Sequence, residues 1–498
     1  MREQTSRAPV LGDRDFVKAL TLTDATMLVA GSMIGSGIFI VSSDIARTVG
    51  TPFWLMTAWV ITGVMTLLGA LTYGELAGMF PKAGGQYVFL RESMGPLMGF
   101  LYGWTLLVVI QTGTIAAVAV AFGRFLGVLW PAVTPELYSW FPRHTFVTPG
   151  GTIEVGLSAQ RVVALVMVWL LTWINLRGIR EGKLVQTTLT IVKTGALALL
   201  IVLGLTVGRN ATALTANFAP GNFAPHVDIT SMFVLGFGTA LVGSLFSSDA
   251  WNNVTFAAAE VQNPRRNLPL SLALGTGLVT VLYLLANLAY LNVLPLIGSA
   301  HGAAVLARGI QFATQDRVGV AAAEIIFGPI GVTLVAAAIL VSTFGCNNGL
   351  ILAGARVSYA MSLDRLFFKR AGTLNRHDVP AFALVVQAIW TSFLCLTGTY
   401  GQLLDYVIFA ALVFYVATTL GLFVLRVKRP NAERPYRAFG YPVLPALYMA
   451  MAAAVAVALV VADKTRTQAM SGLVIVLIGV PIYFLWRGAA GDTARQAV

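Results

Sequence analysis

Glycine and serine interrupt an apolar segment near the N-terminus, in the run Gly31–Phe39 (GSMIGSGIF). A helix in lipid satisfies its own backbone groups, so a break at that depth is tolerated only where the freed groups meet protein, water or a ligand. The half-helix after such a break presents N–H groups and a positive dipole end, which favour an anion. The segment therefore predicts a ligand-binding site.

A second interruption, Gly243–Asn253 (GSLFSSDAWNN), lies five predicted spans later. Paired breaks in two halves of a chain indicate an inverted-repeat transporter, in which carbonyls ending one half-helix hold a cation or ammonium group. An α-amino acid, with both charges on one carbon, fits this pair of features. Close packing of small residues explains either cluster alone, but it does not explain their matched positions.

Two charged residues stand alone inside apolar segments. Lys193 is costly to bury unless it is paired or deprotonated, and a lowered pKa would permit proton coupling. A structural lysine that reaches the interface is the less favoured alternative. Asp249 could meet a cationic group or a proton, but we favour a capping role for the half-helix that follows it. A free carboxylate there would admit lysine, arginine or a polyamine.

The composition is that of a polytopic membrane protein, with 498 residues, 57% hydrophobic and 11% charged. About 20 apolar residues cross a bilayer, and this criterion predicts twelve spans. They lie near 20–45, 52–80, 97–122, 162–176, 184–207, 230–257, 269–296, 322–360, 380–397, 403–425, 441–462 and 469–486.

The basic residues test this topology. With the N-terminus inside, about 22 Lys and Arg fall in inner loops and about nine in outer loops, as the positive-inside rule requires. We therefore expect a multi-pass protein of the cell (inner or plasma) membrane with both termini cytoplasmic. The net charge of +12 reflects this topology and contact with anionic lipid.

Other classes lack the residues that they need. The four histidines fall in predicted loops without ligand partners, and there is no phosphate-binding GxxxxGK[ST] motif, so we expect neither an enzyme, a metal, a cofactor nor ATP-driven transport. Cys346 and Cys395 fall in predicted helices, so no disulfide-linked heavy chain is expected. The polar first 18 residues and the long first span do not fit a cleaved signal peptide.

Five ordered motifs carry a family resemblance. They are Gly31–Phe39, Glu75 followed by Pro81–Tyr87 (PKAGGQY), Trp251–Asn253 (WNN), Asn263–Pro269 (NPRRNLP), and Ser342–Gly345 (STFG) before Asn348-Gly349. The chain resembles the amino acid–polyamine–organocation superfamily, and within it the L-amino acid transporter branch and its bacterial relatives.

The resemblance implies an all-α membrane protein of twelve transmembrane helices. A five-plus-five inverted repeat of the leucine-transporter type, with helices one and six broken, would form the core beside two peripheral helices. Helices one, two, six and seven would move as a bundle during alternating access. The implied divisions are a cytoplasmic tail (1–18), a first repeat (19–208), a second repeat (209–428), and peripheral helices with a cytoplasmic C-terminal tail (429–498).

The resemblance also implies roles for residues at the two breaks. The N–H groups of Ser36, Gly37 and Ile38 would hold the substrate carboxylate. Ile34 and the carbonyls of Phe246 and Asp249 would lie near the amino group. Phe246 would also be the gate over the substrate, and Asn252 would line the sixth helix.

Lys193 matches the fifth-helix lysine that occupies the sodium position of sodium-coupled relatives. The resemblance therefore implies sodium-independent transport, with Lys193 joining the first break to the hydroxyls of Ser342 and Thr343. We further expect Glu75 and Glu260 to pair with loop arginines such as Arg265 or Arg266 in an inner gate. Arg356, toward the cytoplasmic end of its span, is expected to extend to the interface.

Three functions remain open. The leading one is sodium-independent transport of neutral L-amino acids, by exchange or proton symport. The second is transport of cationic amino acids or polyamines, favoured if Asp249 points into the cavity. The third is a membrane sensor that binds an amino acid without moving it, against which the short predicted tails argue.

Overall fold

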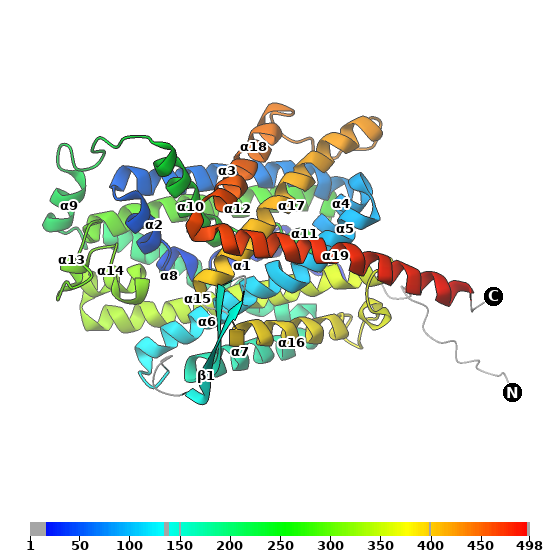
Figure 1. Cartoon of the computed structure of the whole chain (residues 1–498), viewed down its shortest axis with the longest axis horizontal. Helices are drawn as coiled ribbons and strands as arrows, with labels where there is room; N and C mark the ends of the chain where they lie inside the picture. The colour runs from blue at the N-terminus through cyan, green and yellow to red at the C-terminus, as the bar shows by residue number, and fades with distance from the viewer. Residues whose placement is uncertain (1–15, 134–138, 149–150, 398–399, 496–498) are drawn as a thin grey trace.

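The structure is a computed structural model that describes residues 16–133, 139–148, 151–397 and 400–495. It is a bundle of helices, most of which run along the long axis of the molecule (Figure 1). The α-helices are α1 (Leu22–Met33), α2 (Ser42–Val49), α3 (Pro52–Met79), α4 (Gln86–Met94), α5 (Pro96–Thr105), α6 (Gln111–Leu129), α7 (Ala159–Leu176), α8 (Ile179–Leu205), α9 (Ala211–Phe218), α10 (Ser231–Ser247), α11 (Asn253–Phe256), α12 (Pro264–Val293), α13 (Val305–Arg308), α14 (Val318–Phe327), α15 (Pro329–Leu363), α16 (Ala381–Thr397), α17 (Tyr400–Lys428), α18 (Val443–Val461) and α19 (Asp463–Arg495).

Shorter elements link these helices. Four are 3₁₀ turns and one, η2, is a π-helical segment that joins α5 to α6. They are η1 (Gly37–Phe39), η2 (Leu106–Ile110), η3 (Ala258–Glu260), η4 (Thr314–Asp316) and η5 (Lys369–Gly372).

Nine helical segments in the described residues are long and apolar enough to cross a membrane. Three shorter apolar helices, α10, α14 and α16, accompany them. The predicted all-α membrane architecture is therefore confirmed, whereas the count of twelve spans stays a prediction. Start signals in the sequence match the structure: Thr51 caps α3 by accepting the N–H of Trp54, and Pro52 occupies the first turn.

The predicted span over 322–360 is wrong at its beginning. Residues 318–327 form the separate helix α14, and α15 starts at Pro329. Gly328 lies between them with a φ of 64°, a conformation that side chains disfavour, and the proline then begins a new helix. Hydropathy alone merged the two helices because both are apolar.

The region over 127–160, which lies between two predicted spans, contains a two-stranded antiparallel hairpin. Its strands are β1 (Ser139–Thr148) and β2 (Gly151–Ser158), with His144 opposite Val155 and Thr148 opposite Gly151. Threonine and valine occur in both strands, with phenylalanine in β1 and isoleucine in β2, as is typical of β-structure. The Pro and Gly content of the region hid this pattern.

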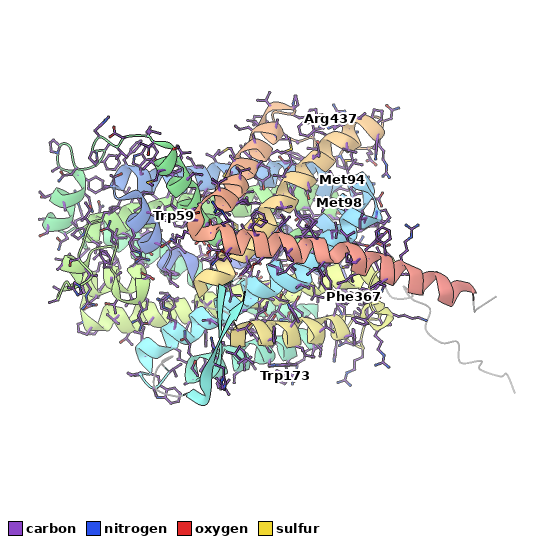
Figure 2. The ribbon with its side chains drawn as sticks, in the orientation of Figure 1. Trp59, Met94, Met98, Trp173, Phe367 and Arg437 are labelled. Carbon is purple, nitrogen blue, oxygen red and sulfur yellow. The ribbon has the colours of Figure 1, made fainter. Side chains whose placement is uncertain are left out.

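The long helices bury their faces against one another. Helix α12 packs on α3, α1 and α8, while α15 packs on α6 and α8. Large apolar side chains on α7 face outward, and Trp173, 50% exposed, lies at the edge of the molecule (Figure 2). Such an outer surface suits lipid. The predicted tail over 1–18 falls mostly outside the described residues, and the predicted repeat boundaries stay predictions.

Candidate functional site

Both predicted interruptions occur in the structure. Helix α1 ends at Met33, η1 follows at Gly37–Phe39, and α2 begins at Ser42. Helix α10 ends at Ser247 and α11 begins only at Asn253. Two helices are therefore unwound inside the bundle, and their free backbone groups need partners.

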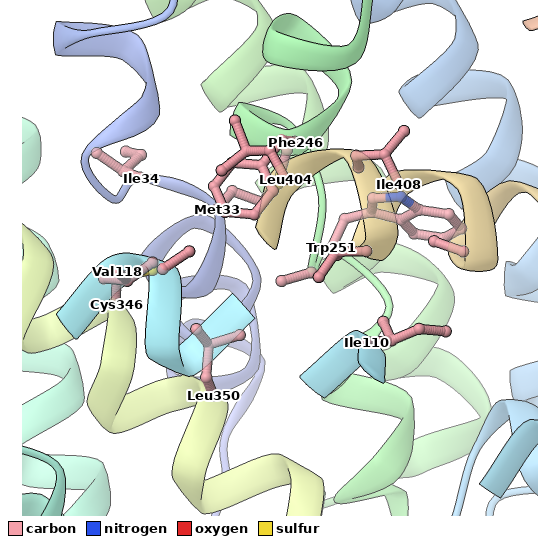
Figure 3. Close-up of a cluster of buried hydrophobic side chains, with 14 of the residues drawn as sticks. Met33, Ile34, Ile110, Val118, Phe246, Trp251, Cys346, Leu350, Leu404 and Ile408 are labelled. Atoms are coloured by element: carbon pink, nitrogen blue, oxygen red, sulfur yellow. The ribbon is translucent and has the colours of Figure 1, made fainter. Parts of the chain in front are cut away.

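The two breaks touch each other. A Cβ atom on Gly37 would lie 2.1 Å from Ser247 Oγ and 3.0 Å from Ser247 Cα, so only glycine permits this approach. Met33, Ile34 and Phe246 belong to one cluster of buried side chains at this junction (Figure 3). The residues expected around the substrate amino group thus come from adjacent segments.

Lys193 of α8 reaches the carbonyl ends of the first break. Its Nζ lies 2.5 Å from the Gly31 carbonyl, 2.7 Å from that of Ile34 and 3.4 Å from that of Ser342. The side chain is 1% exposed, which excludes extension to the interface. An ammonium group placed among three carbonyl oxygens occupies the type of position that a metal cation would take.

The residues on α15 differ in part from expectation. Ser342 does join this cluster, because its hydroxyl donates to the carbonyls of Ile34 (3.2 Å) and Gly35 (3.1 Å). Thr343 does not, since its hydroxyl donates to Ile339 and Leu340 within its own helix. The expected contact of Lys193 with the Thr343 hydroxyl is therefore wrong.

Tyr283 of α12 joins the two breaks, and the sequence analysis missed it. Its hydroxyl lies 3.0 Å from the Met33 carbonyl and 3.1 Å from the Ser247 carbonyl. One hydroxyl thus contacts the last carbonyl of α1 and the last carbonyl of α10, the two helices that precede the breaks. The available signal was a tyrosine in the middle of a predicted span, where its hydroxyl requires a buried partner.

Asp249 does not cap the half-helix that follows it, so the favoured capping interpretation is wrong. Helix α11 begins four residues later, its N-cap is Asn252, and no side chain caps it. Asp249 instead accepts a hydrogen bond from the Tyr415 hydroxyl of α17 and one from the N–H of Ala250. No basic side chain pairs with this buried carboxylate among the described residues.

Two small cavities lie on either side of Asp249 and Tyr415. They measure about 10 Å³ and about 20 Å³, room for about one water molecule each. Asn252 lines the first, and its side chain donates to Gln86 Oε1 at 2.9 Å. Neither of these two cavities is lined by Ile34, Ser36, Gly37, Ile38 or Phe246, and neither is large enough for an amino acid. Since Gly37 packs directly on Ser247, the two breaks are closed against each other in this conformation.

A buried ion pair closes the bundle beyond the second break. Arg356 of α15 lies 3.1 Å from Glu260, and both side chains are 1% exposed. The expected extension of Arg356 to the interface is therefore wrong, because Glu260 offers a buried partner. Leu20 N donates to the Glu260 carbonyl at 2.9 Å, which ties the start of the first broken helix to the end of the second.

Glu75 pairs with arginines of an inner loop, as expected, but not with the two that were named. Its carboxylate binds Arg426 at 2.6 Å and Arg434 at 3.0 Å, and it accepts the N–H of Ala438. Arg265 instead pairs with the exposed Glu433. The examples Arg265 and Arg266 are not the partners of Glu75, because α3 packs beside the end of α17 and the segment that follows it.

Comparisons with known proteins agree with this geometry. The family model described as "Amino acid permease" matches residues 20–481. The serine/threonine exchanger SteT of Bacillus subtilis (strain 168) is 30% identical over 95% of this chain and 97% of its own length. The b(0,+)-type amino acid transporter 1 of Mus musculus is 28% identical over 87% of this chain and 81% of its own. Large neutral amino acids transporter small subunit 2 of Mus musculus is 28% identical over 94% and 81%.

Proposed function

The chain belongs to the amino acid permease family, and on this premise we propose that it is a sodium-independent secondary transporter of neutral L-amino acids. Transport proceeds by alternating access, as exchange or proton symport. The observation that carries this proposal is the position of Lys193, whose ammonium group fills the carbonyl cluster at the first break. Because the Lys193 ammonium group supplies the positive charge at this carbonyl cluster, Na⁺ is not needed there.

The two breaks supply the substrate contacts in this proposal. N–H groups of Ser36, Gly37 and Ile38 bind the carboxylate, because the N-terminus of a half-helix carries the positive end of its dipole, which favours an anion. The amino group lies toward Ile34 and the carbonyls of Phe246 and Asp249. Phe246 is the gate. Asn252, whose side chain is held by its hydrogen bond to Gln86, orients the substrate.

The closed conformation supports alternating access. The cavities beside Asp249 are too small for an amino acid, so substrate entry requires that the packed elements separate. The Glu260–Arg356 pair and the bond between Leu20 and Glu260 lie where the two broken helices meet, and they form the gate on the cytoplasmic side.

One observation favours a second candidate, transport of cationic amino acids or polyamines. The Asp249 carboxylate borders both cavities, and no cation pairs with it in the described part of the chain. A buried carboxylate is costly unless it is neutralised or paired. A cationic substrate group, or a proton, would supply what the protein does not.

The location follows from the same premise. We place the protein in the plasma membrane with both termini in the cytoplasm, because basic residues concentrate in the loops assigned to that side. Relatives include a protein described as a small subunit. Cys346 and Cys395 are both buried in helices, so this chain offers no exposed thiol for a disulfide to a partner subunit.

Uptake into proteoliposomes of the purified protein tests the proposal. Labelled neutral, cationic and acidic amino acids are supplied outside, with empty or amino-acid-loaded lumens, with Na⁺ or choline, and with or without an inward proton gradient. We expect uptake of neutral amino acids that is independent of Na⁺. A requirement for a loaded lumen identifies exchange, whereas uptake into empty vesicles driven by protons identifies symport.

The contrary results are equally definite. Uptake of only lysine, arginine or polyamines replaces the leading candidate by the second. Binding without any uptake replaces transport by sensing. Uptake that requires Na⁺ contradicts the role given to Lys193.

A further inference from the structure

A larger cavity lies away from the two breaks, at the end of the molecule formed by α13, α14 and the start of α15. In Figure 1 this end lies on the left, opposite α4 and α5. The cavity measures about 150 Å³, against about 10 and 20 Å³ beside Asp249. A cavity of about 150 Å³ accepts a molecule of about the size of benzene, which is also the size class of a small amino acid.

The lining combines two guanidinium groups, one carboxylate and an apolar wall. Ala313 and Thr314 complete the set. The residues are Val128, Val305, Arg308, Ala313, Thr314, Arg317, Val320, Ala321, Glu324 and Val332.

The two arginines converge on one residue. Arg308 donates from Nη1 to the Thr314 hydroxyl and from Nε to the Gly302 carbonyl, and Arg317 donates from Nε to the Thr314 carbonyl at 3.3 Å. For Arg317, no bond from its terminal nitrogens is found among the described residues. A guanidinium whose terminal nitrogens are not hydrogen-bonded can bind a carboxylate through two parallel hydrogen bonds.

The local charge is positive. Burial and the neighbouring Arg124 charge both lower the pKa of Arg317. Asp316 does not offset this, because it pairs with Arg47 at 2.6 Å and with Arg124 at 3.8 Å. Arg47 and Arg124 thus share the Asp316 carboxylate, while the Arg317 guanidinium lies in the field of Arg124, an arrangement that an added anion would stabilise.

Glu324 supplies the opposite charge at the other end of the cavity. It lies two helical turns beyond Arg317, about 10 Å along the axis of α14, and both long side chains can close part of that distance. In the described part of the chain the side chain of Glu324 is exposed and has neither a hydrogen bond nor an ion pair. Four valines lie in the wall between these charges.

We propose that this cavity is a second binding site for a small zwitterionic amino acid. Arg317 and Arg308 bind its carboxylate, Glu324 binds its ammonium group, and the valines contact its side chain. The class of ligand, an amino acid, is taken from the proposed function, and the inference rests on that function to this extent. It uses none of the residues at the breaks.

Helix α14 lies between the cavity and the first break. Gly319, in the first turn of α14, faces Phe39 of η1: a Cβ there would lie 2.7 Å from Phe39 Cδ1. The opposite face of α14 carries Val320, Ala321 and Glu324. A ligand in the cavity therefore presses on the helix that covers the first break.

Binding of labelled L-serine to the purified full-length protein tests the proposal. The number of molecules bound at saturation is measured for the wild type and for Arg317→Gln and Arg308→Gln. We expect two in the wild type. In each variant the second site should weaken by at least about tenfold, because a charge-assisted hydrogen bond is lost. Arg209→Gln, which removes an exposed arginine outside the cavity, should still bind two.

A fourth variant separates this proposal from the proposed function. Gly37→Val blocks the first break, so it should abolish exchange and retain one bound serine, which Arg317→Gln then removes. If the wild type binds one serine that Gly37→Val removes, the second site does not exist while the transport proposal stands. If Gly37→Val fails to fold, the comparison of wild type with Arg317→Gln still decides.

The ligand class has its own control. The carboxylate 3-hydroxypropionate is serine without the amino group, and it should not displace serine from the second site of the wild type. In Glu324→Gln the two compounds should compete more equally. If 3-hydroxypropionate displaces serine from the wild-type site as well as serine itself does, the cavity is a plain anion site and the assignment to a zwitterion is wrong.

Discussion

At the scale of single residues, Lys193 is the strongest point of agreement between sequence and structure. An isolated lysine in a predicted span requires a partner, and the partners are backbone carbonyls that the first break sets free. The sequence could predict the need for a partner. The family resemblance named the Ser342 hydroxyl, but the sequence could not predict that the Ser342 carbonyl contacts Lys193, because that depends on the rotation of α15 about its axis.

Replacement of Lys193 by alanine tests the cation position. We expect exchange to fall at least about tenfold, because each buried carbonyl left without a donor costs about 1–3 kcal/mol. The cluster of carbonyls from Gly31, Ile34 and Ser342 would then be open to a small cation, so Na⁺ should restore part of the activity. Uptake is measured in Na⁺ and in choline. Lys464→Ala, at an exposed lysine, is the matched control, and normal exchange by Lys193→Ala contradicts the proposal.

Asp249→Asn tests which substrates the buried carboxylate selects. Asparagine retains an oxygen that can accept the Tyr415 hydroxyl and the Ala250 N–H, so the break should keep its shape. For a neutral amino-acid transporter we expect the substrate preference to be unchanged. Competition of lysine and arginine against a labelled neutral amino acid measures this preference. If the wild type prefers the cationic competitors and the variant does not, Asp249 binds the substrate cation.

At the scale of elements, the ends of the two broken helices are tied together and to α15. Leu20 donates its N–H to the Glu260 carbonyl and accepts the N–H of Gln262, and Arg356 of α15 pairs with Glu260. Breaking one partner of a buried ion pair costs about 3–5 kcal/mol, whereas replacing both by apolar residues of similar volume is often neutral. A comparison of the single and double variants therefore distinguishes a pair that gates transport from a pair that only stabilises the fold.

We expect Glu260→Gln alone to destabilise the protein by about 3–5 kcal/mol, because Arg356 stays buried without a counter-charge. The double variant Glu260→Met with Arg356→Met should recover most of that stability but should still exchange slowly, since the closure is lost. Thermal unfolding and exchange are measured on the same preparations. Arg265→Gln, which removes the exposed pair with Glu433, should change stability by less than about 1 kcal/mol. Normal exchange by the double variant would show that the pair is only structural.

The elements also show how far sequence reasoning reaches. Both breaks were predictable because glycine and serine clusters interrupt long apolar runs. The division at Gly328 and the hairpin of β1 and β2 were not, because hydropathy does not register a positive φ or a pairing between strands. Tyr283 and Tyr415 were missed for a related reason. Their hydroxyls acquire roles only when α12 and α17 pack against the breaks.

At the scale of the whole molecule, the charge distribution and the cavity beside α14 imply that the two ends have different roles. The end with α4 carries basic residues paired to Glu75, Glu92 and Asp364. The end with α13 and α14 carries the proposed second site. If the end with α4 faces the cytoplasm, an amino acid outside the cell meets the cavity beside α14 before it reaches the breaks.

Labelling of single introduced cysteines decides this orientation. Both natural cysteines are buried in helices, so they should react little with an impermeant maleimide added to intact cells. Ala303→Cys lies in an exposed position before α13, and Asn431→Cys in an exposed position after α17. We expect Ala303→Cys to react in intact cells and Asn431→Cys only after permeabilisation, because the second lies in a strongly basic segment. The reverse pattern would invert the topology and would place the Glu260–Arg356 pair on the outer side. The unsubstituted chain is the control for background labelling.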